Sequence, residues 1–342
     1  GREIVGRLVF LGCLLLVPAV SISQQNDFVG SWLLWVEAGN QGEPAYGSLD
    51  VEQAGDTLAV YVDGGPAALL ELEGNRIGFE FDWDDLWDLP HVSVLNGMLE
   101  NGVISGTVRS EGQDRGAWRA TRRLPVDRNA PPEPADLNGI WGPPALISRH
   151  TFDLTEAGRA ADAAYDPTLD DPILRCVSDG LVRMSHGPFH IEVLEGDGRV
   201  VVIHEDLHEV RRIYTDGRGF PEGIEDAGLA MGFSIGHWEG STFVIETRGL
   251  KRTVWDAAGM PISPSAIVTE RWYLDDTGRL HIEISMDDPE NYHRPVLMHI
   301  VRSKRPADTV VPEYACDPHG FYRGLEFSDQ LQEYWGRSGN RL

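Results

Sequence analysis

The sequence predicts a mainly β protein in which two antiparallel barrels follow one another, with a short helix in the second block and a further candidate helix at the C-terminus. The motif Asp-x-x-Gly-x-Trp occurs twice, as DFVGSW (Asp27 to Trp32) and DLNGIW (Asp136 to Trp141). After each copy, apolar residues alternate with polar ones along short segments, which is the pattern of half-buried strands. A proline-rich segment separates the two runs, so we expect each run to fold as its own barrel.

The N-terminal residues have the composition of a signal peptide. Arg2 and Arg7 precede the apolar run LVFLGCLLLVPAV, and the small residues Ser21 and Ser23 follow it. The run is too short to span a bilayer but fits the apolar core of a signal peptide. We therefore predict export to the periplasm or the extracellular space, and no membrane span in the mature chain.

These patterns divide the chain at four points. The predicted parts are a signal peptide (1–23), a first barrel (24–123), a linker with four prolines (124–135), a second and larger barrel (136–306) and a C-terminal tail packed on the second domain (307–342).

Each barrel has its own local signals. In the first, apolar residues alternate at Ile77, Phe79, Phe81 and Trp83, and Asn101-Gly102 predicts a tight hairpin turn. In the second, the alanine-rich segment 154–165 predicts a helix with Thr155 as its N-cap. Strands with short turns follow it, and segment 325–337 is a candidate amphipathic helix.

Gly-x-Trp at the start of a block and an arginine on its last strand resemble the lipocalin or calycin barrel. In that family the indole fills the closed end and the arginine packs across it. The resemblance implies that Trp32 pairs with Arg119 or Arg122, and Trp141 with Arg302. Stacking of this kind is favourable by about 0.5–2 kcal/mol. Two unrelated antiparallel sandwiches that share a tryptophan are the alternative.

The second block also resembles a group of exported bacterial proteins without an assigned activity. The resemblance implies a family and no catalytic residue. It is carried by LTEAGRAADAAYDPTLDDPILRC, HEDLHEVRRIYTDGR, FSIGHWEGSTFVIET, ERWYLDDTGRL and DDPENYHRP, between Leu154 and Pro295.

Charge and cysteine content limit the partners and the compartment. The formal net charge is -25, and such a surface repels phosphate backbones, so we expect no nucleic-acid partner. Cys176 and Cys316 remain after signal removal, and an exported protein favours a disulfide between them, with two separate thiols as the alternative. The long loop implies a stabilisation of about 4–5 kcal/mol.

Histidines concentrate in the second half of the chain, where ten of eleven lie between His150 and His319. His204, Asp206 and His208, with His237 from a neighbouring strand, are candidate ligands for a divalent metal. Four residues of straight strand cover about 13 Å, which is too far for His204 and His208 to hold one ion. A solvated strand face is therefore favoured, and no cofactor is predicted.

A second candidate site uses ionisable residues in apolar strands. If segment 200–214 is one strand, Glu205 and Arg211 share a face with aliphatic residues and point into the barrel, where a buried charge needs a partner. With Glu270, and with His208 or His237 as acid or base, they would form a catalytic site. A structural ion-pair network that sets the barrel register is the favoured alternative.

Loop residues at the barrel mouth are candidate ligand contacts. Trp255, Tyr292, His293 and Arg294 lie on predicted loops at strand ends, where ligands enter barrels. Ordinary loop packing is the alternative.

Three functions fit these patterns. The first is an exported two-barrel protein that binds a small, partly apolar molecule in the second barrel. The alternative is an acid–base or metal-assisted enzyme acting on a small molecule in that barrel, and the third is an envelope protein whose barrels are spacers. The sequence names neither the ligand nor a protein partner, because fold does not fix function.

Overall fold

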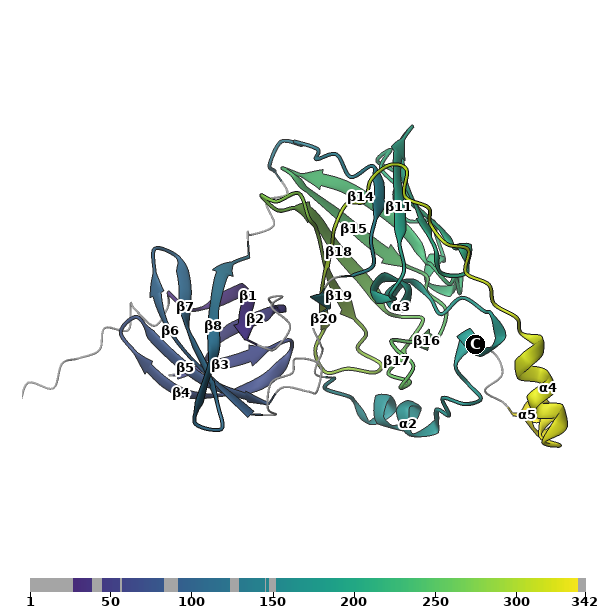
Figure 1. The fold of residues 1–342 in the computed structure, drawn as a ribbon, viewed down its shortest axis with the longest axis horizontal. Helices are drawn as coiled ribbons and strands as arrows, with labels where there is room; N and C mark the ends of the chain where they lie inside the picture. The colour runs from purple at the N-terminus through teal and green to yellow at the C-terminus, as the bar shows by residue number, and fades with distance from the viewer. Residues whose placement is uncertain are drawn as a thin grey trace, which may run out of the picture.

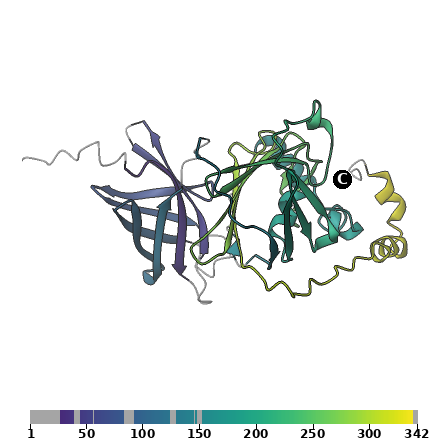
Figure 2. The same cartoon turned by 90° about the horizontal axis from the view of Figure 1, so that it is seen from above.

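The structure, a computed structural model, describes residues 27–38, 45–55, 57–82, 92–123, 129–144, 146–147 and 152–337. The predicted signal peptide, Trp83, His91, His150 and linker residues 124–128 lie outside the described residues. Two β domains lie side by side, and the C-terminal helices extend from the far side of the second (Figures 1 and 2). Among the helices that the structure describes, none is long and apolar enough to cross a membrane.

The first domain is a closed barrel of eight strands. Each strand pairs antiparallel with the next, and β1 pairs with β8 to close the ring. The strands are β1 (Gly30–Ala38), β2 (Ala45–Ala54), β3 (Thr57–Val62), β4 (Gly65–Glu73), β5 (Arg76–Asp82), β6 (Val92–Glu100), β7 (Val103–Ser110) and β8 (Gln113–Arg122).

Alternation explains how this barrel fills its interior. Every second residue of β1 from Trp32 to Val36 is fully buried, and Phe79 of β5 packs edge-on against Trp118 of β8 with ring centroids 5.6 Å apart. The predicted hairpin turn is present between β6 and β7, with φ of 51° at Asn101 and 79° at Gly102. The interior is therefore an apolar core.

Two glycines on adjacent strands allow close packing in the first barrel, Gly97 against the Trp118 indole and Gly106 against the β6 backbone. A Cβ on Gly97 would lie 2.5 Å from that ring, and a Cβ on Gly106 would lie 1.7 Å from the backbone oxygen of Asn96. We expect Gly106→Ala to force β6 and β7 apart and to lower the free energy of unfolding of the first barrel by about 3 kcal/mol, the upper end for overpacked sites. Urea denaturation followed by tryptophan fluorescence checks this. Gly196→Ala, where a Cβ meets nothing within 4 Å, is the matched control, and equal losses in both variants would contradict the steric explanation.

The second domain is a ten-stranded sheet that curls into a nearly closed barrel. The sheet order is β10-β20-β19-β18-β15-β14-β13-β12-β11-β9. The chain around Trp141 meets the end of β20 through a bridge to Lys304, and Arg305 N donates to Ile140 O at 2.7 Å. The strands are β9 (Gly139–Trp141), β10 (Leu146–Ile147), β11 (Ile191–Gly196), β12 (Arg199–His204), β13 (Val210–Tyr214), β14 (Phe233–Glu239), β15 (Thr242–Arg248), β18 (Ile267–Leu274), β19 (Leu280–Asp287) and β20 (Val296–Arg302), with the separate pair β16 (Thr253–Val254) and β17 (Pro261–Ile262).

One pairing in this sheet departs from the antiparallel expectation. β13 and β14 run parallel, with Ile213 opposite Ser234. The connection over 215–232, which includes η4 (Ile224–Asp226), returns the chain to the same end of the sheet. A parallel pair needs such a crossover because a tight hairpin turn reverses the strand direction.

The segment expected to form one strand over 200–214 is instead two strands. The short turn η3 (Asp206–His208) interrupts it, and Leu207 and His208 have φ of 50° and 54°. The interruption moves the inward face from even-numbered to odd-numbered positions: Val202 and His204 are buried before the turn, Arg211 and Ile213 after it. A bulge-like interruption of this kind re-aims the side chains that follow it.

The helices among the described residues lie in the second domain and the tail. The expected N-cap is present, since Thr155 Oγ1 accepts from Gly158 N at 3.0 Å, and the predicted C-terminal helix is two short helices. The Cys176–Cys316 disulfide is present, with a Cα–Cα distance of 5.8 Å, and fastens the tail to the second domain. The elements are α2 (Glu156–Ala164), η2 (Pro172–Arg175), α3 (Leu181–His186), α4 (His319–Phe327) and α5 (Leu331–Gly336).

Candidate functional site

Arg211 and Glu270 form a buried ion pair inside the second barrel. Their side chains are 2% and 1% exposed. Arg211 donates to both carboxylate oxygens, through Nη1 to Oε1 at 3.1 Å and through Nη2 to Oε2. The neighbouring polar groups are used as well: Arg211 Nε donates to Ser234 Oγ at 3.1 Å, Arg211 Nη2 to Thr247 Oγ1 at 2.9 Å, and Trp272 Nε1 to Glu270 Oε1 at 3.1 Å. These contacts tie strands β13, β14, β15 and β18 together within a contiguous apolar core.

The other acid–base candidates do not join this pair. Glu205 accepts from the backbone nitrogen of His190 at 2.9 Å and pairs with His190 Nδ1 at 2.7 Å. His208 is exposed. His237 is 61% exposed and pairs with Glu239 Oε1 at 2.9 Å. Arg211 therefore meets Glu270 and not Glu205, because the turn at η3 separates the two faces.

The four candidate metal ligands are dispersed. His204 points into the barrel, where burial, followed by the charges of Arg302 and Arg211, lowers its pKa to about 3. Asp206 is buried in the η3 turn, while His208 and His237 are exposed. Among the described residues, no group of three or more His, Cys, Asp or Glu side chains is arranged to hold a metal ion.

The four predicted rim residues have different surroundings. Trp255 and Tyr292 are both 3% exposed and belong to the core cluster of the second barrel, not to a rim. The Tyr292 hydroxyl donates to Pro261 O at 2.7 Å. His293 is exposed. Arg294 reaches the first barrel, where it pairs with a glutamate of β2 and stacks on a tyrosine of β3 (Glu52 at 2.8 Å, Tyr61 at 3.6 Å).

The tryptophans that head the two blocks have different cationic neighbours. The Arg122 guanidinium lies 4.3 Å from the Trp32 ring centroid, whereas Arg119 lies over Trp35. In the second barrel, Lys304 Nζ lies 5.5 Å from the Trp141 ring. Arg302 is fully buried and donates to three backbone oxygens, those of Gly142, Phe189 and Ser185, each at 2.8 Å. It holds backbone segments together at this end of the barrel.

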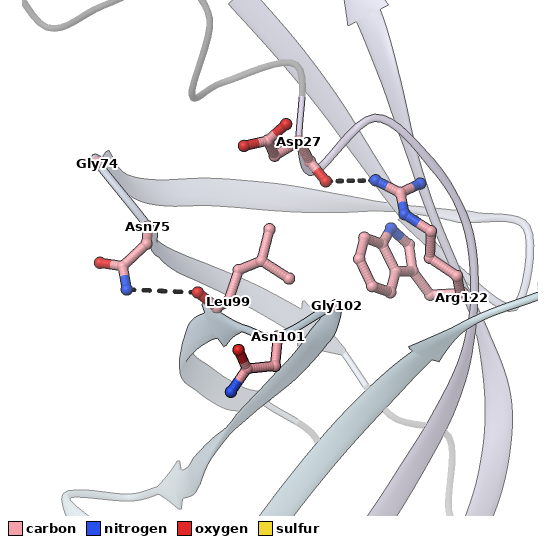
Figure 3. Close-up of a pocket in the computed structure, with 8 residues that line it drawn as sticks. Asp27, Gly74, Asn75, Leu99, Asn101, Gly102 and Arg122 are labelled. Atoms are coloured by element: carbon pink, nitrogen blue, oxygen red, sulfur yellow. Dashed lines mark hydrogen bonds between the residues drawn. The ribbon is translucent and has the colours of Figure 1, made fainter.

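A hollow of about 420 Å³ lies at the Trp32 end of the first barrel (Figure 3). It is bordered by the β4–β5 and β6–β7 turns. Its polar side chains are largely engaged: Asn75 Nδ2 donates to Leu99 O at 3.3 Å, and Arg122 donates to Val29 O at 2.8 Å and to Asp27 O. The lining residues are Asp27, Trp32, Gly74, Asn75, Leu99, Asn101, Gly102 and Arg122.

A second hollow of about 260 Å³ lies between the two barrels, and we call it the inter-barrel cleft. One wall is the outer face of β1 and β8, and the other is the outer face of β18 and β19 with the β14–β15 turn. The lining residues are Leu33, Thr121, Arg122, Arg123, Ser241, Thr242, Arg271, Tyr273, Leu274 and Glu283.

Glu283 is the centre of the charged groups in this cleft. Its Oε1 accepts from the Tyr273 hydroxyl at 3.0 Å, its Oε2 lies 3.8 Å from Arg123 Nε, and Arg271 is its cross-strand partner. Burial, and then the Glu283 charge, raises the pKa of Tyr273, which therefore stays a hydroxyl donor. Arg123 Nε is buried and has no hydrogen-bond partner among the described residues.

The cleft carries the opposite charge to the protein as a whole. Among the residues that line the cleft, Arg123 and Arg271 face a single carboxylate, so two positive charges and one negative leave an excess of one. The third lining arginine, Arg122, turns its guanidinium over Trp32 at the end of the first barrel. The chain as a whole has a formal charge of -25. A concave site with such an excess concentrates anions from solution.

Sequence reasoning did not single out Arg123, Arg271, Tyr273 or Glu283. Arg271, Tyr273 and Glu283 lie on the outward faces of β18 and β19, and Arg123 directly follows β8; charged residues are ordinary at such positions. The available signal was the Arg122-Arg123 pair just before the linker, which places two cations at the junction of the domains.

Comparison with known proteins assigns no family to the chain: no protein-family model matches it, and no curated protein does. Among solved structures, a DUF3598-family protein of unknown function from Nostoc punctiforme has a TM-score of 0.25 and 10% identity, over 82% of this chain and 99% of that one. The Aeromonas veronii immune modulator A has a TM-score of 0.22 and 11% identity, over 81% of this chain and 94% of that one.

Proposed function

We propose that this protein binds a small, partly apolar organic anion in the inter-barrel cleft. The observation that carries the proposal is a hollow of about 260 Å³ whose walls combine two leucines with Arg123 and Arg271. Ligand sites are mostly apolar concave surfaces with a few convergent polar groups, and they occur preferentially at domain interfaces. Leu33 and Leu274 would contact the apolar part of such a molecule.

The arginines define the charged end of the ligand. A guanidinium presents a planar fork of donors that matches a carboxylate, and such charge-assisted bonds are about twice as strong as neutral ones. Arg123 Nε lies 3.8 Å from Glu283 Oε2 and makes no hydrogen bond among the described residues, so a ligand carboxylate would supply the acceptor that this buried donor needs. The hydroxyls of Thr121, Ser241 and Thr242 are further donors at the same walls.

This proposal keeps the small, partly apolar ligand that the sequence predicts and moves it from the interior of the second barrel to its outer face. The interior carries the satisfied Arg211–Glu270 pair within an apolar core. An acid–base or metal-assisted reaction in that interior gains no support from the described positions of Glu205, His208 and His237.

We further propose that the protein acts outside the cytosol. The Cys176–Cys316 disulfide supports this, since such bonds form and persist in oxidising compartments.

The test uses benzoate and hexanoate as probes, with benzamide as the neutral analogue of benzoate. We expect Arg123→Gln and Arg271→Gln each to weaken benzoate binding by about 10-fold or more, because a hydrogen bond to a charged group contributes about 1.5–3 kcal/mol. Titration calorimetry on the full chain measures the loss.

Arg212→Gln is the matched control, because Arg212 is exposed on β13 outside the cleft. Benzamide binding as tightly as benzoate, an equal loss in the Arg212 variant, or no binding of either acid at millimolar concentration would overturn the proposal.

A further inference from the structure

Two buried histidines lie where the second barrel meets the first. His281 on β19 and His299 on β20 are 3% and 1% exposed. His281 Nδ1 and His299 Nε2 are 2.9 Å apart, and His281 Nε2 lies 3.1 Å from Asp275 Oδ2. The three residues form one hydrogen-bonded chain on the outer face of the second barrel.

The hydrogen bonds among Asp275, His281 and His299 determine which ring nitrogens carry protons. The ionised Asp275 carboxylate only accepts, so His281 Nε2 carries a proton and His281 Nδ1 is an acceptor. His299 Nε2 must then donate to it. This assignment follows from the hydrogen-bond network. In this arrangement both rings are neutral, and a further proton on His281 Nδ1 would require His299 to move its own proton from Nε2 to Nδ1.

The first barrel covers this pair with Tyr46 from β2. The Tyr46 ring stacks on His299 with centroids 5.6 Å apart and meets His281 edge-on at 5.5 Å. Tyr273, which lines the inter-barrel cleft, stacks on His281 at 5.1 Å. Arg279 Nη2 donates to the Tyr46 hydroxyl at 2.9 Å. The histidines are therefore shielded from water by the contact between the barrels.

The charged groups around the two histidines include some that raise the histidine pKa and some that lower it. Burial lowers the pKa of His281, Asp275 and Glu283 oppose that shift, and Arg279 adds to it. Burial lowers the pKa of His299 well below its ordinary value, followed by the charges of His281 and Arg123. Tyr46 also interacts with Arg119 from the first barrel. Burial is the largest cause for both rings, and burial depends on the barrels staying together.

We propose that the His281–His299 pair makes the joint between the two barrels acid-sensitive, so that acidification separates the barrels and takes apart the inter-barrel cleft. Release of the anion rests on the function proposed above, whereas opening of the joint does not. The cleft exists only while both walls are in place, because Arg123 comes from the first barrel and Arg271 from the second.

The direction follows from proton binding. In the joined state both histidines stay neutral, while in the separated state water returns and each takes up a proton near its ordinary pKa of about 6.5. The joined state therefore keeps its full stability above that pH and loses it as the pH falls below it. Between pH 7 and pH 5 the opening equilibrium should rise by at most about 25-fold for each histidine, the limit reached when a ring stays neutral in the joined state throughout that range.

Bound anion opposes this opening by linkage. A ligand that needs both walls binds only the joined state, so it should lower the pH at which the joint opens, and acid should weaken its binding to the same degree.

The test follows the full chain by small-angle X-ray scattering from pH 7 to pH 5 without ligand. We expect the radius of gyration to rise, while circular dichroism shows that both barrels stay folded. His281→Phe/His299→Phe keeps ring packing without titration and should lose this pH dependence. His281→Gln, for use if the double variant does not fold, should reduce it to the effect of one histidine. His293→Gln, at an exposed histidine beside the joint, should keep the full response.

Benzoate titrations at pH 7 and pH 5 separate the two proposals. An acid-induced expansion without benzoate binding would support the acid-sensitive joint and contradict the proposed ligand site. An unchanged radius of gyration, or the same expansion in the double phenylalanine variant, would overturn the inference. Benzoate binding of equal strength at both pH values, together with the expansion, would contradict the cleft as the binding site and leave the opening of the joint standing.

Discussion

Arg211→Met is expected to lower the free energy of unfolding of the second barrel by about 3–5 kcal/mol, the typical loss when one partner of a buried ion pair is removed. The variant leaves the Glu270 carboxylate, which is 1% exposed, without its guanidinium. Ser234 and Thr247 lose their shared donor as well. A buried carboxylate without a counter-charge must take up a proton or draw water into the core, and both cost free energy.

The double variant Arg211→Met/Glu270→Leu should recover most of this loss. Replacing both partners by apolar residues of similar volume removes the charge that would otherwise be stranded, and such replacements are often neutral or stabilising. Urea denaturation of the four proteins in the cycle gives the coupling free energy. Arg212→Met, at the exposed neighbouring position, should change stability by less than about 0.5 kcal/mol.

If the double variant is as unstable as Arg211→Met, the loss does not come from the unpaired Glu270 charge. The ion pair would then stabilise the barrel more than apolar residues of similar volume do. Binding of benzoate to Arg211→Met at full strength is expected, because Arg211 lies inside the barrel and away from the inter-barrel cleft. Loss of that binding in a folded variant would place the site in the interior after all.

The first barrel was predictable because its signals are local. Alternation along β5 puts Ile77, Phe79 and Phe81 on one face, and Asn101-Gly102 supplies the two positive φ values that a tight hairpin needs. Each of these properties depends on residues a few positions apart. Strand order then follows from consecutive hairpins, which leave little choice of neighbour.

The second barrel was less predictable because the η3 turn, which strand propensity did not reveal, determines which side chains face its interior. The apolar run Val200–Ile203 and the segment Arg211–Tyr214 both favour strands. Glu205, held by His190 of the preceding connection, begins a turn in which Leu207 and His208 adopt positive φ. The partner of Arg211 therefore depends on a contact that lies elsewhere in the chain.

Arg211 and Glu270 were still recognisable as site candidates. A charged residue that alternates with aliphatic ones faces the core and must find a counter-charge there. The sequence identifies both residues as candidates but does not show that they contact each other, since 59 residues separate them. Conversely, Arg123 and Glu283 meet only because two finished barrels dock, and neither strand pattern carries information about that docking.

The Cys176–Cys316 disulfide should contribute about 5 kcal/mol in the loop-closure treatment, because it closes a separation of 140 residues. Measured losses for native disulfides are about 2–5 kcal/mol, and we expect Cys176→Ser/Cys316→Ser to fall in the upper half of that range. The loop contains almost the whole of the second barrel, so the bond restricts the unfolded state of that domain and leaves the first barrel outside the loop.

The first barrel thus serves as an internal reference in the same molecule. Urea denaturation should show the second-barrel transition moving to lower urea concentration in the double serine variant, while the first-barrel transition stays in place. The tail keeps other contacts, since Arg175 Nη1 donates to the Tyr334 hydroxyl at 2.7 Å and Arg337 pairs with Asp170 at 3.2 Å. If these contacts alone hold the tail, limited proteolysis will cut the variant no faster than the parent. Rapid cleavage between Cys316 and Leu331, with an unshifted second-barrel transition, would show instead that the bond fastens the tail and contributes nothing to the barrel.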